Sequence, residues 1–285
     1  MKMEINFEQK RKFFVLLPLL MLIFSICFLI YNYTQKGEFF EKSIELKGGN
    51  LIEINTKTPL DTIYLERELS KKFGFVSIRS LKGFNIYTTM IEVESYIEPE
   101  DVLKELQNLG VNTERNSIKK IGSSLGSSFW VQAQEGIIVA FIFMFIIIFI
   151  IFRNFMPSIT VTLCSAADIL FALAMSQLLG IKISLAGVAA LLTIIAYSAD
   201  SDVLLATRLF KGEGKLWDRY KSALKTGLTI ASIAMSVLIV LLLFGLNPVL
   251  FQISSILLFG LIADVINSWL GSGGILLWYC ERRGI

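Results

Sequence analysis

The sequence predicts a polytopic membrane protein that is mostly α-helical, with six transmembrane helices and one α+β domain inserted between the first and second of them. Three observations support this. Of the 285 residues, 54% are hydrophobic, whereas a soluble globular chain is about 45–50% apolar even when glycine is counted. Six apolar stretches are long enough to cross a bilayer. Most charged side chains are concentrated in residues 34–135.

The first span is predicted over residues 13–33, after a short cytoplasmic segment of residues 1–12. It follows three basic residues, 10–12, as the apolar part of a signal peptide would. Its length, however, suits a span of about 20 residues, whereas the apolar part of a signal peptide has about 7–15. No small-x-small cleavage motif follows it. We therefore expect an uncleaved transmembrane helix.

Residues 34–135 alternate between strand and helix patterns. The expected strands and helices, in chain order, are strand 43–57, helix 60–73, strand 75–81, strand 84–93, helix 99–109 and strand 111–121. The order βαββαβ is that of a small ferredoxin-like sandwich. Such a fold does not specify a function, and one interpretation is a folded spacer.

The rest of the chain consists of apolar stretches with short connections. The further predicted spans are residues 136–152, 157–179, 185–207, 222–245 and 250–279. Residues 208–221 form a loop between the fourth and fifth spans, and residues 280–285 form the carboxy-terminal tail.

Lysine and arginine in the short segments predict the orientation, because they are enriched on the cytoplasmic side. With the amino terminus in the cytoplasm, the two short outer loops carry only Lys182. The cytoplasmic segments then hold Lys2, Lys10, Arg11, Lys12, Arg153, Arg208, Lys211, Lys215, Arg219, Lys221, Arg282 and Arg283. We expect a multi-pass protein of the cytoplasmic membrane with both termini cytoplasmic and residues 34–135 outside.

Composition excludes several classes of function. The chain has no histidine, which removes the commonest general base and metal ligand. None of its three cysteines lies in residues 34–135, so no disulfide framework or metal-ligand spacing is present. A net charge of +3 is too small over this length to indicate nucleic acid. We expect no metal, and no cofactor, since no ATP-binding loop is found.

Four aspartates interrupt otherwise apolar, helix-length stretches: Asp168, Asp200, Asp202 and Asp264. A carboxylate within hydrocarbon costs roughly 2.5–3.5 kcal/mol on insertion scales, so such residues are functional candidates by default. At about 1.5 Å rise per residue, Asp200 and Asp264 fall at nearly the same depth and Asp168 lies near mid-membrane. We expect these three to share one layer of the bundle. The alternative is that each is a protonated, hydrogen-bonded packing residue.

The fourth span carries a polar stripe at helical spacing, formed by Thr193, Tyr197, Asp200 and Thr207. Asp202 lies about 200° around the helix from Asp200. The two carboxylates therefore cannot face the same partner. At least one of them is expected to face a second helix or a second chain.

Cations within the spans are few. Lys225 lies near the start of the fifth span, where it either extends to the cytoplasmic headgroups or pairs with an acidic residue inside the bundle. Arg153 and Arg208 are expected to be anchors at the membrane boundary.

The fourth span also resembles a known family. Residues 185–198, followed by Ala199-Asp-Ser-Asp202 and Arg208, closely resemble the fourth span of SecF proteins, which are protein-export membrane proteins related to RND transporters. The resemblance covers essentially the whole chain. Its further matching positions are Lys47-Gly48-Gly49, residues 121–126, Ala167-Asp168, Tyr197, Ser198 and the stretch from Gly260 to Ser268.

The chain departs from the bacterial pattern of this family, which usually reads Gly-Tyr-Ser-x-Asn-Asp-Thr over residues 196–202. The family's proton-linked aspartate falls on Ser201, with an acidic residue on either side. Asp264 stands where bacterial members carry glycine, and Lys225 where they carry arginine. This pattern resembles the archaeal branch.

The resemblance implies a SecF-like subunit of the auxiliary complex that assists Sec-dependent preprotein export, using the ion (proton) gradient. It implies a heterodimer with SecD, action beside the SecYEG translocon, an unfolded preprotein as substrate, and membrane lipids as surroundings. The ion-coupling candidates are Asp168, Tyr197, Asp200, Ser201, Asp202, Lys225 and Asp264.

Three other interpretations were weighed. A subunit of an RND-type exporter of small molecules or lipids normally needs both halves in one chain and larger outer domains. A structural scaffold of the translocon without ion coupling is a second. An intramembrane aspartyl protease needs a carboxylate dyad, but its Tyr-Asp and Gly-x-Gly-Asp pairings are absent, since Asp200 follows Ala199 and Asp264 follows Ala263. We therefore expect a transport protein and not an enzyme.

Overall fold

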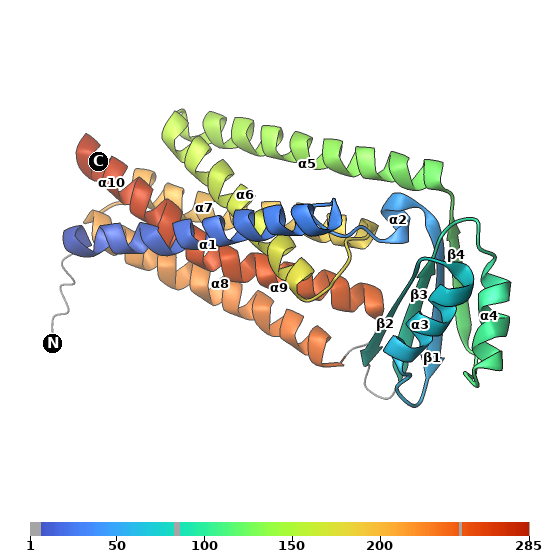
Figure 1. Ribbon diagram of the computed structural model, residues 1–285. Helices are drawn as coiled ribbons and strands as arrows, with labels where there is room; N and C mark the ends of the chain where they lie inside the picture. The colour runs from blue at the N-terminus through green and yellow to red at the C-terminus, as the bar shows by residue number, and fades with distance from the viewer. Residues whose placement is uncertain (1–6, 83–85, 245–246, 285) are drawn as a thin grey trace.

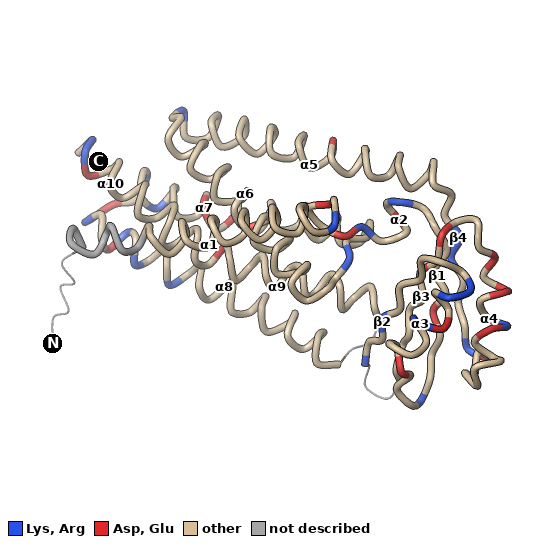
Figure 2. The backbone as a smooth tube through the Cα atoms, in the orientation of Figure 1, with Lys and Arg blue, Asp and Glu red and all other residues tan. Residues whose placement is uncertain are grey.

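The computed structural model describes residues 7–82, 86–244 and 247–284, and it divides into a long helical bundle and a small α+β domain at one end of it (Figure 1). Charged residues gather in the small domain and at the two ends of the bundle, and few lie along its length (Figure 2). This distribution is that of a protein whose bundle crosses a bilayer, because charge is costly in the hydrocarbon layer.

Within the described residues, six helices are long and apolar enough to cross a membrane. They are α1 (Phe7–Lys36), α5 (Ser123–Phe152), α6 (Phe155–Leu178), α7 (Leu185–Lys211), α8 (Leu216–Phe244) and a last helix made of α9 (Pro248–Ile266), η1 (Asn267–Ser272) and α10 (Gly273–Arg283). The predicted fold class, mostly α with six spans, is confirmed. The segment η1, in which the helix widens to a π-helix, was not predicted.

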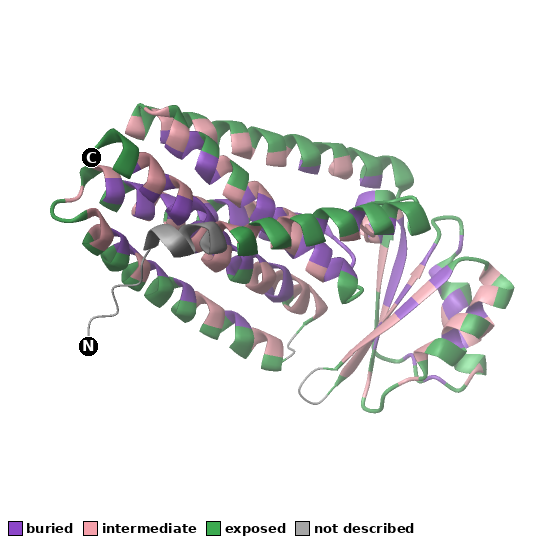
Figure 3. Cartoon of the chain, turned by 60° about the vertical axis from the view of Figure 1, so that its left-hand side comes forward, coloured by how far each residue is buried: buried purple, intermediate pink, exposed green. Residues whose placement is uncertain are grey.

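The helices differ in how much of their surface the chain itself covers. Helix α5 and the part of α1 from Val15 onward are largely exposed, whereas α6, α7 and α9 contribute many of the buried residues of the bundle (Figure 3). From Ile138 to Ile151 the exposed residues of α5 are all large and apolar, and they include Ile142, Phe143 and Ile150. Such a surface suits lipid, which needs no polar partner from the protein.

Some helices extend beyond the apolar stretches that mark them in the sequence. Helix α5 begins at Ser123, before the expected start of the second span at residue 136, and α8 begins at Leu216, inside the predicted loop 208–221. Hydropathy detects the apolar part of a helix, whereas backbone hydrogen bonding continues through polar residues until a cap or a break ends it.

The small domain has the predicted order βαββαβ. Its elements are β1 (Gly49–Thr56), α3 (Thr62–Phe73), β2 (Val76–Lys82), β3 (Tyr87–Val93), α4 (Pro99–Asn108) and β4 (Asn116–Ile121). The strands form a sheet in the order β2-β3-β1-β4, with every neighbouring pair antiparallel. Helices α3 and α4 cover one face, where Ile52, Ile91 and Leu106 are fully buried (Figure 1). The expected ferredoxin-like domain is confirmed.

The first expected strand, residues 43–57, is partly wrong. It begins with a single helical turn, α2 (Ile44–Lys47), capped by the Ser43 side chain, which accepts a hydrogen bond from the backbone N–H of Glu45. Ile44 and Leu46 are buried in this turn. Two apolar residues at alternate positions are compatible with a strand and with one helical turn, so periodicity could not separate them.

Two glycine motifs that lie far apart in the sequence meet where α2 approaches α5. Gly48 has a φ of +84°, which favours glycine, and a Cβ at Gly48 would overlap the backbone of Ser123. A Cβ at Gly126 would in turn overlap the backbone of Gly48. Both glycines are therefore needed for the small domain to join the bundle at this close contact.

Candidate functional site

Helices α6, α7 and α9 pack closely in the middle of the bundle. Gly260 of α9 lies against Ile194 of α7, and a Cβ at this glycine would overlap the Ile194 side chain. Small residues allow transmembrane helices to approach closely, because the lipid provides little hydrophobic driving force between them. Glycine is therefore needed at position 260 for packing. Its small size lets α7 and α9 approach closely, and this brings the acidic residues of the two helices near each other.

Three acidic side chains from these three helices form a buried group, which we call the acidic cluster: Asp168 of α6, Asp202 of α7 and Asp264 of α9. Their exposed fractions are 0%, 0% and 1%. Asp168 and Asp202 both lie close enough to Asp264 for their charges to interact. The three helices thus bring carboxyl groups into one layer, as the sequence predicted for Asp168 and Asp264.

Hydrogen-bond donors are distributed unevenly over the acidic cluster. The two carboxylate oxygens of Asp264 accept hydrogen bonds from the hydroxyls of Ser268 (2.7 Å) and Ser201 (2.8 Å). One oxygen of Asp168 accepts from Nδ2 of Asn267 at 2.7 Å. Both oxygens of Asp202 are buried and have no hydrogen-bond partner among the described residues.

Further unpaired oxygen atoms lie in the same region. Within the described part of the chain, the buried atoms Asp168 Oδ2, Asn267 Oδ1 and Ser272 Oγ also have no hydrogen-bond partner. Two hydroxyls lie beside Asp202. That of Ser268 donates to Asp264, and that of Ser272 is free to turn toward Asp202. No lysine or arginine of the described residues forms an ion pair with the acidic cluster.

Several of the polar side chains that surround the acidic cluster lie on η1, and Ser201 of α7 is another. The segment η1 contributes Asn267, Ser268 and Ser272, all of them buried. Single π-helical turns inside α-helices are often found at functional sites. The resemblance to the family extended to Ser268, but none of these three residues was predicted as a site residue, although the polar run of Asn267-Ser268 followed by Gly271-Ser272 inside an apolar span was a signal.

The structure places Asp200 apart from the acidic cluster, which corrects the prediction that it shares a layer with Asp168 and Asp264. Asp200 is exposed on the surface of the bundle, and Asp202 takes the inward position. The expected polar stripe is also exposed, and we call it the outward face of α7: Thr193, Tyr197, Asp200 and Thr207. Side chains two positions apart on a helix point in nearly opposite directions. The predicted depth of the residues therefore did not decide which of the two aspartates points inward.

Of the remaining predicted site residues, the two serines lie inside the bundle and the two basic residues are exposed. Ser201 bonds to Asp264, and the hydroxyl of Ser198 accepts a hydrogen bond from Ser165 of α6 at 2.8 Å. Lys225 is exposed on α8, so the alternative in which it pairs with an acidic residue inside this bundle is wrong for the described residues. Arg208 is exposed near the end of α7.

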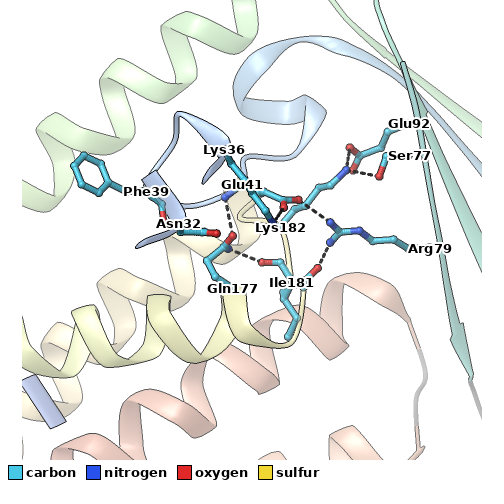
Figure 4. Close-up of polar contacts among 11 residues, drawn as sticks. Asn32, Lys36, Phe39, Glu41, Ser77, Arg79, Glu92, Gln177, Ile181 and Lys182 are labelled. Atoms are coloured by element: carbon cyan, nitrogen blue, oxygen red, sulfur yellow. Dashed lines mark hydrogen bonds and ion pairs between the residues drawn. The ribbon is translucent and has the colours of Figure 1, made fainter. Parts of the chain in front are cut away.

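A second polar region, which we call the junction, connects the small domain to the loop between α6 and α7 (Figure 4). Lys182 in this loop forms an ion pair with Glu92 of β3 at 2.5 Å and donates to Ser77 of β2 at 2.9 Å. Arg79 of β2 pairs with Glu41 at 2.9 Å and donates to the backbone carbonyl of Gly180. These contacts hold the sheet against the ends of the two helices that carry Asp168 and Asp202.

Charges at the junction compensate one another. Burial lowers the pKa of Lys182, and the neighbouring Glu92 carboxylate opposes that shift. Burial acts to raise the pKa of Glu41, but the hydrogen bond and charge of Lys36, together with the charge of Arg79, outweigh it, so the pKa of Glu41 is lowered. Lys182 and Arg79 thus each have a carboxylate partner within ion-pair distance.

A cavity of about 620 Å³ lies beside the junction, between the helix-free face of the sheet and the adjoining ends of the bundle helices. Leu51 and Met90 of the sheet and Phe251 of α9 contribute to its apolar lining. Its charged lining has both signs: Arg79, Lys119, Lys182, Glu45, Glu53 and Glu92.

Comparison with known proteins identifies the family. Residues 101–282 match the family described as Protein export membrane protein SecD/SecF, C-terminal. The SecF protein of Pyrococcus furiosus is 31% identical over 284 residues, covering 99% of this chain and 95% of the relative. The SecF protein of Methanocaldococcus jannaschii is 34% identical over 276 residues, covering 93% and 94% respectively.

Solved structures agree in fold. The crystal structure of SecDF, a translocon-associated membrane protein from Thermus thermophilus, superposes with a TM-score of 0.77 at 18% identity. The match covers 97% of this chain and 39% of the solved chain, so this chain spans well under half of that protein. The curated matches in sequence are to archaeal proteins of nearly the same length. The chain, a multi-pass membrane protein with six spanning helices and one ferredoxin-like domain, therefore belongs to the SecF branch of the SecD/SecF family of protein-export membrane proteins.

Proposed function

We propose that this chain is the SecF subunit of a SecD–SecF complex that assists Sec-dependent export of unfolded preproteins, driven by the ion gradient across the cytoplasmic membrane. The observation that carries the proposal is that α7 has two polar faces. Asp202 is buried against α6 and α9, whereas Asp200 is exposed on the opposite face of the same helix. One helix thus presents an acidic residue to the inside of the chain and another to a second protein.

The outward face of α7 is suited to a partner helix. An exposed aspartate on a membrane-spanning segment is costly in lipid, and polar side chains on such helices usually face protein or water. Tyr197 and Thr193 on the same face are able to bond across an interface. The chain spans 39% of the solved SecDF chain, which leaves room for a SecD-like half as that partner.

The arrangement in the membrane follows from the loop charges. Both termini are cytoplasmic, and residues 34–135 lie outside, beside the SecYEG channel, where the small domain meets the emerging preprotein. The junction transmits motion to this domain: a shift of α6 relative to α7 moves Lys182 and Gly180, which are bound to Glu92 and Arg79 of the sheet.

Preprotein translocation into sealed vesicles tests the proposal. SecD, SecYEG and this chain are reconstituted, and translocation is measured with and without an imposed proton or sodium gradient. The wild type is compared with single Asp→Asn changes at positions 168, 200, 202 and 264. We expect the gradient to increase translocation in the wild type, and the changes within the acidic cluster to abolish that increase.

Two results would argue against this function. Equal translocation with and without a gradient would favour a scaffold that is not coupled to an ion. Failure of the chain to co-purify with SecD and SecYEG, together with resistance of its host to small toxic compounds, would favour an exporter of the RND type.

A further inference from the structure

The cavity beside the junction extends over the helix-free face of the whole sheet. Each strand contributes to its lining: Ser77, Arg79 and Leu81 of β2, Met90 and Glu92 of β3, Leu51 and Glu53 of β1, and Lys119 of β4. The loop between α6 and α7 and the first turn of α9 form the opposite wall (Figure 4). Its volume of about 620 Å³ is within the range of ligand pockets, about 300–1,000 Å³. The cavity therefore has room for a ligand, on the side of the membrane to which the small domain belongs.

The cavity reaches an open edge of the sheet. Strand β2 is the first in the order β2-β3-β1-β4 and so has a neighbour on one side only. Side chains of consecutive strand residues point to opposite faces, yet Arg79, Ser80 and Leu81 all line the cavity, which must therefore reach the backbone here. Among the described residues, no backbone hydrogen bond joins β2 to any element other than β3. The outward N–H and C=O groups of an edge strand in this state can pair with another extended chain.

The two edges of the sheet differ in how they are protected. Strand β4 carries Lys119 and Lys120 in succession, and lysine on an edge strand discourages pairing with another chain. Before its last residue, β2 carries one charge, that of Arg79. The guanidinium of Arg79 is held at the junction by Glu41 and by the Gly180 carbonyl. Pairing is therefore expected at the edge of β2 and not at that of β4.

The charges of the cavity favour a polypeptide over a phospholipid headgroup. Its lining has three basic and three acidic residues. Each of the basic residues is paired with a carboxylate: Lys182 with Glu92, Arg79 with Glu41, and Lys119 with Glu53. A phosphate group is bound by cations that are free to pair with it, and the cavity offers no excess of them. A polypeptide of mixed composition needs no such excess, and its apolar side chains suit the lining contributed by Leu51, Met90 and Phe251.

We propose that the cavity receives an extended segment of the exported polypeptide, which pairs with the outer edge of β2 as an added strand. Every residue except proline offers the main-chain N–H and C=O groups that this pairing uses, so it does not depend on a particular sequence. Alternate side chains of the added strand point into the cavity, toward Leu81 and Met90. That the segment belongs to a preprotein rests on the proposed function, but the binding of an extended peptide does not.

The experiment uses the full chain, purified alone in lipid nanodiscs. The probe is a fluorescent peptide of about 8 residues, an ordinary strand length, in which valine alternates with serine and threonine. A second peptide has proline at two central positions, because proline lacks the N–H group and does not pair within a sheet. Binding is measured by fluorescence anisotropy. We expect the wild type to bind the first peptide at least about 10-fold more tightly than the second.

Met90 and Thr88 offer matched variants. They lie two residues apart on the same face of β3, and of the two only Met90 lines the cavity. Met90→Trp fills the cavity with an indole ring, whereas Thr88→Trp places the same ring outside it. We expect Met90→Trp to weaken binding of the first peptide by at least about 10-fold and Thr88→Trp to leave it unchanged. The unfolding midpoint of each variant shows whether it folds.

A milder variant covers the case in which Met90→Trp does not fold. Met90→Ser removes apolar contact and leaves the space open, and it is expected to weaken binding by about 3- to 10-fold. Equal binding of the two peptides, or undiminished binding in the folded variant of Met90, would overturn the proposal. A phospholipid that co-purifies with the wild type but not with Met90→Trp, found by mass spectrometry without any peptide binding, would assign the cavity to lipid instead. Loss of peptide binding on addition of SecD would assign the edge of β2 to that subunit.

Failure of the site and failure of the function are separable. If the isolated chain binds the peptide in the cavity while translocation ignores the gradient, the site stands and the proposed coupling fails. If Met90→Trp loses peptide binding but translocates like the wild type, with the same stimulation by the gradient, the proposed function stands and the cavity is not a preprotein site.

Discussion

The acidic cluster contains fully buried acidic groups and the junction contains partly buried ones, but among the described residues only the junction contains the cations that neutralise them. At the junction, Glu92 is paired with Lys182 and Glu41 with Arg79. In the acidic cluster, Asp202 has no cation among the described residues, and the polar groups beside it are the neutral hydroxyls of Ser268 and Ser272. A carboxylate neutralised by its own chain keeps its charge and holds a structure in place. One that is not neutralised depends on a cation from outside, and its state changes with the supply of that cation.

The largest effect is expected when the Asp202 carboxyl group of the acidic cluster is removed. Asp202→Asn should reduce gradient-driven translocation to the level seen without a gradient, because an amide neither takes up a proton nor contributes a negative charge to a cation. Translocation into sealed vesicles measures this. Normal stimulation by the gradient in this variant would show that the acidic cluster is a packing feature.

A second change makes the junction resemble the acidic cluster. Lys182→Met leaves the carboxylate of Glu92 without its cation, where the two side chains are only 7% and 13% exposed. We expect the small domain to lose about 2–3 kcal/mol of stability against local opening, measured by hydrogen exchange in β3. The double change Lys182→Met and Glu92→Met should recover most of this loss. An equal loss in both variants would contradict an effect through the ion pair.

A third prediction concerns acid. Because the pKa of Glu41 is lowered in the folded state from its ordinary value of 4.5, its contribution to stability is complete above that value and is lost as pH falls through the lowered one. Arg79→Met should remove about 0.5–1 kcal/mol and weaken this acid dependence. Hydrogen exchange in the loop between α6 and α7, measured from pH 7 downwards, reports both. If Arg79→Met leaves the acid dependence unchanged, the loss of stability at low pH does not come from the pair of Arg79 and Glu41.

The smallest effect on stability is expected for a change on the exposed face of α7, in contrast to a change of Asp202 on its buried face. Asp200→Asn should change the stability of the isolated chain by less than about 0.5 kcal/mol, because the side chain is exposed. It should nevertheless reduce the amount of SecD that co-purifies with the chain. Full recovery of SecD would remove Asp200 from the proposed interface.

Much of this organisation could be predicted from the sequence. Apolar runs marked the six spans, and the alternation of strand and helix patterns in residues 34–135 predicted the ferredoxin-like order, because both signals depend on local periodicity. The sequence showed the glycine motif at Gly48 and Gly49, but not why glycine is required at these positions. That reason became visible only when Gly48 and Gly126 were found in contact.

Rise per residue is a property of the helix, so the amino-acid sequence was enough to predict that carboxyl groups of different spans lie at similar depths. Only the tertiary structure decided that Asp202 rather than Asp200 points inward, and that Asn267, Ser268 and Ser272 surround it on a π-helical turn. The physical reason is that a helix can rotate about its axis without changing the depth of its residues. Packing against neighbouring helices sets that rotation, and no local pattern records it.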